Sequence, residues 1–237
     1  MTRYPLLLLL SVSFTGLVPG QTQPASPSLS VTGNAEVRTS PDQAVVRLGV
    51  TQESATAQEA QRKANSVAQA ILASLRELRI ASKDVQTSQL TLYPIYTDGG
   101  VEPMRREPPR IAGYRASNVV SVTVNKMEQV GPVVDSGLKA GSNQVEGINF
   151  GLQDDTAARQ QALTEAAAEA QKKADTIAKA LGLRITGIQE VIEGGVSVVP
   201  VMARAEMMMA KSDLATPVSP GEVTVNATLT VKYLITK

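Results

Sequence analysis

Residues 56–80 of the chain read TAQEAQRKANSVAQAILASLRELRI. Apolar residues recur there in steps of three and four, so they share one face of a helix: Ala60, Ala64, Val67, Ile71, Leu75 and Leu78. Thr56 and Glu59 have the spacing of a capping box, and Glu59 and Lys63 form an i,i+4 pair on the polar side. The stretch predicts a long amphipathic helix that covers an apolar surface.

Alternating apolar and polar residues lie on both sides of this helix and predict strands. Two strands precede it, at about 29–37 and 44–50, and two follow it, at 85–96 and 114–124. Pro94 suits an edge strand or a strand end, because proline cannot donate to a sheet ladder. The Gly, Pro and charged residues of 97–110 predict a long loop between the last two strands.

The second half of the chain contains two further predicted helices. The first spans about 126–140, with Asn125 as its cap and Gly141 as its stop. The second begins at Asp154 and ends at Gly182. Its alanines allow it to lie close to whatever it covers, and its predicted inner face is Leu163, Ala166, Ala170, Ala174, Ile177 and Leu181.

One order of elements occurs twice along the chain. Strand, long helix, strand, long loop and strand occur at about 44–124 and again at about 147–235, where the alternating strand 223–235 is the last element. A β-α-β-β unit cannot cover both of its faces alone. We therefore predict an α+β fold in which two β-α-β-β repeats form a largely antiparallel sheet, with long Ala-rich helices packed on one side.

The first residues have the pattern of a secretory signal. Arg3 is followed by an apolar run that is too short to span a bilayer, and Val18-Pro19-Gly20 fits a cleavage site. We expect residues 1–20 to be removed near Gly20–Gln21. A disordered lead-in at 21–28 and a single domain at 29–237 would remain, with no transmembrane helix, in the periplasm or outside the cell.

The composition excludes several kinds of site. The chain has no His, no Cys and no Trp, which removes the usual general base, metal ligand and thiol nucleophile. Its 23 basic and 22 acidic residues nearly balance, so no nucleic-acid partner is expected. We predict a protein that is not an enzyme, with no catalytic residue, no cofactor and no metal site.

Several charged residues have plain structural interpretations. Asp154 and Asp155 stand at a helix start, where carboxylates satisfy free N–H groups. Asp42 follows Pro41, and its side chain is expected to bond its own backbone in a turn. Arg105, Arg106 and Arg110 are expected in a solvated loop rather than in a docking patch.

Methionines form the one unusual cluster, which consists of Met202, Met207, Met208 and Met209. Three interpretations stay open. The cluster packs a loop or an interface, since Met fills irregular contacts, it binds a soft metal ion through thioethers, or it is oxidised to the sulfoxide. It is the candidate oxidation-sensitive or interface site of the chain.

A series of short motifs identifies a family. In order they are Gly33-Asn34-Ala35-Glu36-Val37, Pro41-Asp42-Gln43-Ala44, Asp84-Val85-Gln86-Thr87-Ser88, Leu92-Tyr93-Pro94-Ile95-Tyr96, Gly113-Tyr114-Arg115-Ala116-Ser117-Asn118, Gly141-Ser142-Asn143-Gln144-Val145, Gly147-Ile148-Asn149-Phe150, Lys172-Lys173-Ala174 and Pro220-Gly221-Glu222. This order, over about residues 29–237, resembles the SIMPL-domain family of exported bacterial proteins. That family includes periplasmic immunogenic proteins and oxidative-stress defence proteins.

The resemblance implies an envelope or extracellular α+β protein, a tendency of some members to form ring-like or channel-like oligomers, and links to oxidative stress. It implies no catalytic residue. We expect a homo-oligomer or a module that binds an envelope protein, with the loops 97–110 and 202–220 as contact elements. The alternatives are a channel-like or ring oligomer of the envelope and an unrecognised ligand-binding protein or hydrolase.

Overall fold

The computed structural model describes residues 26–97, 109–203, 216 and 218–237. The expected signal sequence and the first part of the expected lead-in therefore lie outside the described residues. In chain order the helices and strands are β1 (Ser28–Thr39), β2 (Gln43–Ser54), α1 (Ala57–Glu77), β3 (Val85–Tyr96), β4 (Ile111–Val124), α2 (Val130–Lys139), β5 (Gln144–Gly151), α3 (Thr156–Ala180), β6 (Arg184–Val199), β7 (Val201–Ala203) and β8 (Val223–Thr236).

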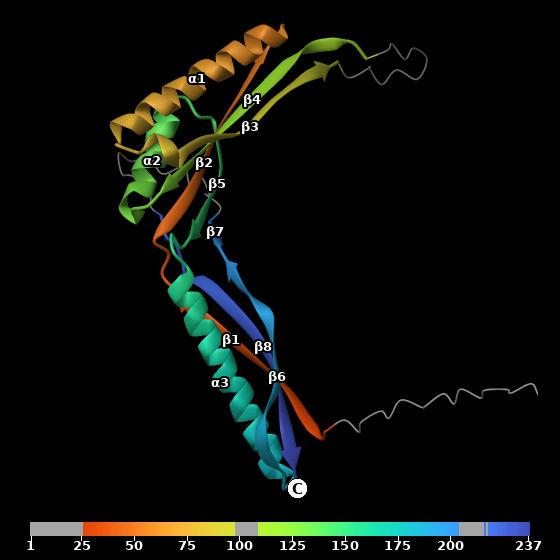
Figure 1. The fold of residues 1–237 in the computed structure, drawn as a ribbon. Helices are drawn as coiled ribbons and strands as arrows, with labels where there is room; N and C mark the ends of the chain where they lie inside the picture. The colour runs from red at the N-terminus through yellow and green to blue at the C-terminus, as the bar shows by residue number, and fades with distance from the viewer. Residues whose placement is uncertain (1–25, 98–108, 204–215, 217) are drawn as a thin grey trace, which may run out of the picture.

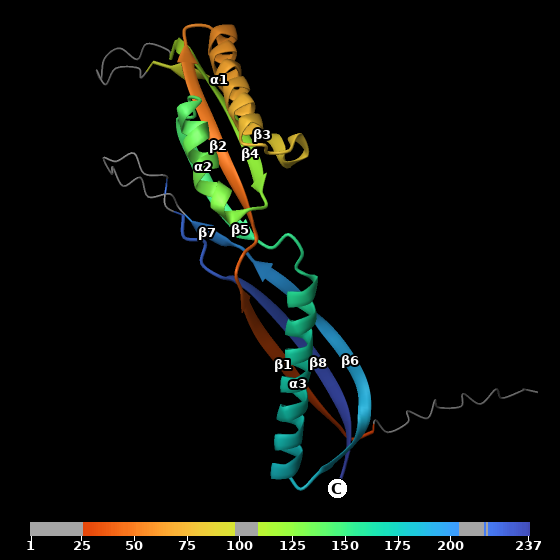
Figure 2. The same cartoon turned by 90° about the vertical axis from the view of Figure 1, so that its left-hand side faces the viewer.

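The strands divide between two antiparallel sheets (Figures 1 and 2). One sheet has the order β3-β4-β2-β5-β7 and is covered on one face by α1 and α2; we call this the five-stranded lobe. The other has the order β1-β8-β6 and is covered on one face by α3; we call it the three-stranded lobe. The two lobes lie end to end, which gives the molecule an elongated shape. The predicted α+β class with antiparallel strands is confirmed.

The expectation of one larger sheet is corrected to two sheets. The predicted second repeat begins with β5, but β5 pairs with β2 in the five-stranded lobe. The strand beside β8 is β1, which pairs with it over its whole length, from Ser28↔Leu234 to Thr39↔Val223. The chain leaves one sheet for the other at Pro41, between β1 and β2, and at Pro200, between β6 and β7. Because proline has no N–H, neither ladder continues through these points.

Strand order is nevertheless similar in the two lobes. The order β3-β4-β2 under α1 corresponds to β6-β8-β1 under α3. β1 therefore takes beside β8 the position that β2 takes beside β4. Strands β3 and β6 are equivalent in this comparison, and each forms one edge of its sheet.

Helix α1 forms as its periodicity predicts. Ala60, Ala64, Ile71 and Leu75 are buried against the five-stranded sheet, and the predicted residues Val67 and Leu78 are partly buried beside them. The hydroxyl of the N-cap residue Thr56 accepts the N–H of Glu59 at 3.3 Å. Periodicity and cap together fix both the face and the start of this helix.

Helix α2 begins later than its sequence predicts. A single 3-10 turn, Met127–Gln129, precedes it. The predicted cap is wrong, because the side-chain oxygen of Asn125 accepts Nε2 of Gln43 at 2.8 Å. Pro132 explains the late start, since proline is tolerated only in the first turn of a helix. The predicted stop at Gly141 is confirmed, with a φ of +104°.

Helix α3 buries alanines rather than larger residues. The buried positions recur every four residues: Ala162, Ala166, Ala170, Ala174 and Ala178. The predicted inner positions Ile177 and Leu181 are wrong, since they are 37% and 65% exposed. The helix lies so close to β1 that a Cβ atom on Gly33 would overlap the carbonyl oxygen of Ala166 and lie 2.7 Å from the backbone nitrogen of Ala170. Only small side chains fit this contact.

Candidate functional site

Edge strands are the surfaces that the described residues leave open for interaction. A sheet edge presents N–H and C=O groups that can pair with another chain, and proteins normally protect such edges. The described residues have four edges, on β3 and β7 in the five-stranded lobe and on β1 and β6 in the three-stranded lobe. They differ in how well they are protected.

The β1 edge is occupied by side chains of α3. The backbone N–H of Asn34 donates to the carboxylate of Glu169, and Nζ of Lys173 donates to the carbonyl of Thr32 at 2.9 Å. Glu169 and Lys173 also form an ion pair at 3.1 Å. The Asn34 N–H lowers the pKa of the Glu169 carboxyl below its ordinary value of 4.5, and Lys173 lowers it further. Lys173 therefore binds the backbone of the β1 edge and does not simply extend into solvent.

This contact should make the stability of the three-stranded lobe pH-dependent. A carboxyl whose pKa is lowered by folding stabilises the fold above its unfolded pKa, and this stabilisation is lost as the pH falls through the folded pKa. Glu169→Gln should therefore be less stable than the wild type at pH 7, and the difference should shrink by pH 3. Urea unfolding at both pH values measures it.

Glu165→Gln is the matched control, because the Glu165 carboxylate accepts a hydrogen bond from Gln161 of the same helix. It should cost less stability at pH 7 than Glu169→Gln does. If Glu169→Gln lowers the free energy of unfolding by the same amount at pH 7 and at pH 3, the contact between Glu169 and the β1 edge is contradicted.

The β6 edge is protected by its irregular shape and its charges. Its pairing with β8 is interrupted by three register shifts, and Gly195 has a φ of +108°. Such bulges twist an edge away from regular pairing. Glu190 and Glu193 place two carboxylates near the middle of the strand. Large apolar residues are nevertheless exposed along it, namely Ile188, Val191, Ile192 and Val199.

The β3 edge has the least protection. None of the residues of β3, Val85–Tyr96, is charged, and its two register shifts, at Ser88 and between Ile95 and Tyr96, leave the stretch between them regular. Pro94 comes only near its end, as the sequence predicts for an edge strand. Leu90, Leu92, Tyr93 and Tyr96 are between 42% and 62% exposed. The segment Gln89–Tyr93, with its free backbone groups, is called the β3 edge below.

The predicted methionine site falls mostly outside the described residues. Met207, Met208 and Met209 lie there, and Met202 stands in the three-residue strand β7, where its backbone pairs with Asn149 of β5. Of the loop arginines, Arg105 and Arg106 also lie outside, and Arg110 is exposed. The structure therefore leaves the interpretation of the Met cluster as a prediction.

The acidic residues at the junction of the lobes have structural roles. The side-chain hydroxyl of Thr156, and then its backbone N–H, which Asp154 accepts at 2.9 Å, lower the pKa of the Asp154 carboxyl. The bond from Arg159, at 2.7 Å, lowers the pKa of Asp155. Asp42 accepts the N–H of Gln153 at 2.7 Å, so the prediction that it bonds its own turn is wrong. Its carboxylate instead joins the segment between β1 and β2 to the segment between β5 and α3, both of which cross between the lobes.

One serine has a lysine within hydrogen-bonding distance. Nζ of Lys63 donates to Oγ of Ser54 at 2.8 Å, and lies 3.9 Å from the Glu59 carboxylate. A nucleophilic serine needs a neighbour that takes its proton, whereas this half-exposed lysine is the donor of an ion-paired network. No group of three acidic side chains that could hold a metal ion occurs within the described ranges.

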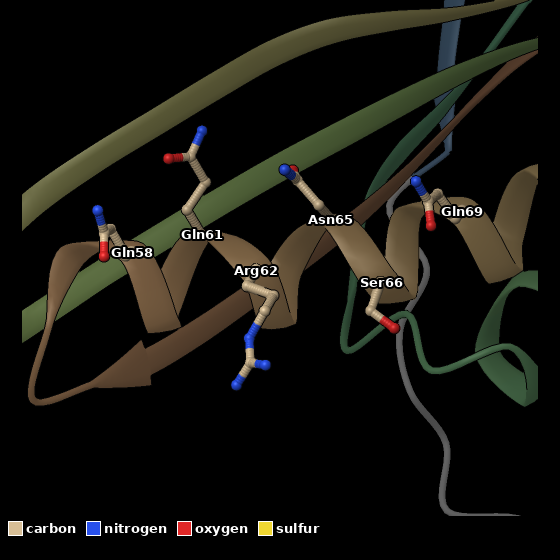
Figure 3. Close-up of a pocket in the computed structure, with 6 residues that line it drawn as sticks. All are labelled: Gln58, Gln61, Arg62, Asn65, Ser66 and Gln69. Atoms are coloured by element: carbon tan, nitrogen blue, oxygen red, sulfur yellow. The ribbon is translucent and has the colours of Figure 1, made fainter.

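Hollows in the described surface are shallow or small. Figure 3 shows six polar residues of α1 around an open hollow, and all of them come from this one helix. A second hollow of about 190 Å³ lies between the end of α1 and the start of β3, beside Leu75, Arg76 and Val85. Ligand pockets usually measure about 300–1,000 Å³ and are mostly apolar. The hollow on α1 has a volume of about 400 Å³ but is open and lined by polar side chains of a single helix, and the second hollow is too small. The β3 edge is therefore the stronger candidate site. Among the helices in the described ranges, none could span a bilayer.

Comparison with known proteins gives consistent matches. Residues 29–233 match the SIMPL family, described as a protein of unknown function (DUF541). The 26 kDa periplasmic immunogenic protein of Brucella melitensis is 30% identical over 218 residues, which cover 90% of this chain and 86% of the relative. The uncharacterized protein YggE of Escherichia coli K12 is 28% identical over 165 residues, which cover 67% of this chain and 64% of YggE.

Proposed function

This chain belongs to the SIMPL family, and we propose that it is a non-enzymatic envelope protein that works by assembly, with the β3 edge as its main contact surface. The single observation that carries the proposal is the contrast between its edges. Side chains of α3 occupy the β1 edge. The β3 edge has no charged side chain, and it exposes its backbone and large apolar side chains. An edge of this kind is a template for pairing with another strand.

The apolar residues at this edge support the same proposal. Leu90, Leu92 and Tyr93 share the hairpin of β3 and β4 with the exposed residues Tyr96 and Ile111. Exposed apolar patches on soluble proteins commonly mark interaction sites, and tyrosine is enriched at interfaces. Burial of these side chains in an assembly would remove an exposed apolar surface from water.

Location in the periplasm or outside the cell is part of the proposal. A Brucella relative is named a periplasmic protein, and the first residues of this chain have the pattern of a secretory signal. With no Cys in the chain, folding in an oxidising compartment would depend on packing alone.

The test of assembly is the size of the mature protein in solution. Sedimentation velocity over a range of concentrations should detect a species larger than one chain. A monomer at every concentration, with no envelope partner, contradicts the proposal.

We further propose that the protein helps the cell to tolerate oxidants through oxidation of its methionine run, Met207–Met209. Thioethers are the remaining easily oxidised side chains in a chain without Cys or Trp. Under brief exposure to peroxide, these three residues should oxidise several-fold faster than Met127, which packs partly buried against the core of the five-stranded lobe. Peptide mass spectrometry measures both rates. Equal rates contradict a scavenging role.

A further inference from the structure

We propose that the partner of the β3 edge is the β3 edge of a second copy of this chain. The two strands would pair antiparallel about a two-fold axis at Thr91. This inference rests on the proposed function, and it adds the occupant of the edge and its register.

The sequence of the edge is complementary to itself in this register. With Thr91 opposite Thr91 of the second copy, Leu90 faces Leu92, and Gln89 faces Tyr93. Residues directly opposite in antiparallel strands have neighbouring side chains, so the pairing brings leucine against leucine. Because β3 has no charged residue, the two-fold axis places no like charges opposite each other.

The leucines of the edge lie on the helix-covered side of the sheet. In the β3–β4 register Leu90 is opposite Asn118 and Leu92 is opposite Ala116, and Ala116 packs against Ala60 and Ala64 of α1. α1 packs mainly on β2 and β4, which leaves both leucines exposed. Antiparallel pairing about Thr91 would place the leucines of both copies together on this side, between the two α1 helices.

The other described edges fit a second copy less well. The β1 edge already binds Glu169 and Lys173, and β7 has only three residues. On β6, a two-fold axis at Val191 would set the carboxylate of Glu190 opposite Ile192, and an axis at Ile192 would set Glu193 opposite Val191. Either register brings an unpaired charge into an apolar contact, which is disfavoured. Three register shifts further disrupt regular pairing on that strand. The unprotected segment of β3 is left as the edge that can extend its sheet.

The absence of cysteine allows a direct test by disulfide trapping. Cα atoms of residues opposite each other in antiparallel strands are about 4.5–5.5 Å apart, within the range that a disulfide spans. Mature Thr91→Cys protein, oxidised briefly with copper phenanthroline and dissolved oxygen, should run mainly as a dimer on a non-reducing gel. A reductant should return it to the monomer.

Val191→Cys is the matched control, because it places a thiol at an exposed position of the equivalent edge, β6. It should give far less dimer under the same conditions. If Thr91→Cys does not cross-link while the protein still sediments as an oligomer, this pairing is overturned and assembly through another surface remains. If the wild type is a monomer throughout, the pairing is overturned, and if it also has no envelope partner the proposed function fails as well. Equal cross-linking of both variants indicates random collision and also overturns the pairing.

Discussion

Gly33→Ala should destabilise the protein by about 3 kcal/mol, at the upper end of what overpacking usually costs. A Cβ atom at this position would overlap the carbonyl oxygen of Ala166 and lie 2.7 Å from the nitrogen and 2.9 Å from the Cβ of Ala170. Two of these three atoms belong to the α3 backbone, so a side-chain rotation cannot relieve the clash. The helix must move away from β1, and the alanine stripe then loses its contacts with the sheet.

Gly151→Ala is the matched control for this substitution. Gly151 also lies in a strand, and a Cβ atom there would meet no other atom within 4 Å. Urea unfolding of both variants gives the comparison, and the control should stay within about 1 kcal/mol of the wild type. A Gly33→Ala variant as stable as Gly151→Ala shows that α3 does not lie as close to β1 as described.

Periodic sequence patterns predict the helices and strands well where one face is buried. Ala60 to Leu75 in α1 and Val223 to Tyr233 in β8 bury the residues that their periods predict. These patterns report only which face of an element is buried. They carry no information about which strand lies beside which, so the division of the strands between two sheets was not predictable from them.

The wrong predictions for single residues have a common cause. Each of these residues is placed by a contact with a segment that is distant in the sequence. In α3 the sequence predicts burial of Ile177 because apolar size usually marks the inner face. The close approach at Gly33 selects the neighbouring alanine row instead, and this leaves Ile177 at the margin. The bond between Asp42 and Gln153 likewise joins two segments that are adjacent only in the folded chain.

The candidate site could be predicted only in part. Pro94 indicates an edge strand, and the uncharged run from Val85 to Tyr93 can be read directly from the sequence. What the sequence does not reveal is that Glu169 and Lys173 occupy the β1 edge. The contrast between the edges, on which the proposal depends, needs the structure.

Leu92→Lys should abolish assembly while leaving the monomer folded. Leu92 is 42% exposed on the β3 edge, so a lysine there meets solvent in the monomer and costs little stability. In the paired edge, the same lysine would bring a charge into an apolar contact, where an ammonium without a partner is strongly disfavoured. The dissociation constant of the assembly should rise by two orders of magnitude or more, which corresponds to a loss of about 3 kcal/mol of binding free energy.

Ser30→Lys is the matched control, because Ser30 is an exposed strand residue on the occupied β1 edge. It should assemble as the wild type does. Circular dichroism and urea unfolding should show that both variants are folded.

The measurement that tests assembly through the β3 edge most directly is sedimentation velocity of wild type, Leu92→Lys and Ser30→Lys at matched concentrations. Wild type and Ser30→Lys should sediment as the same oligomer, and Leu92→Lys should sediment as a folded monomer. Sedimentation of all three proteins as one identical species, whether monomer or oligomer, would contradict the account.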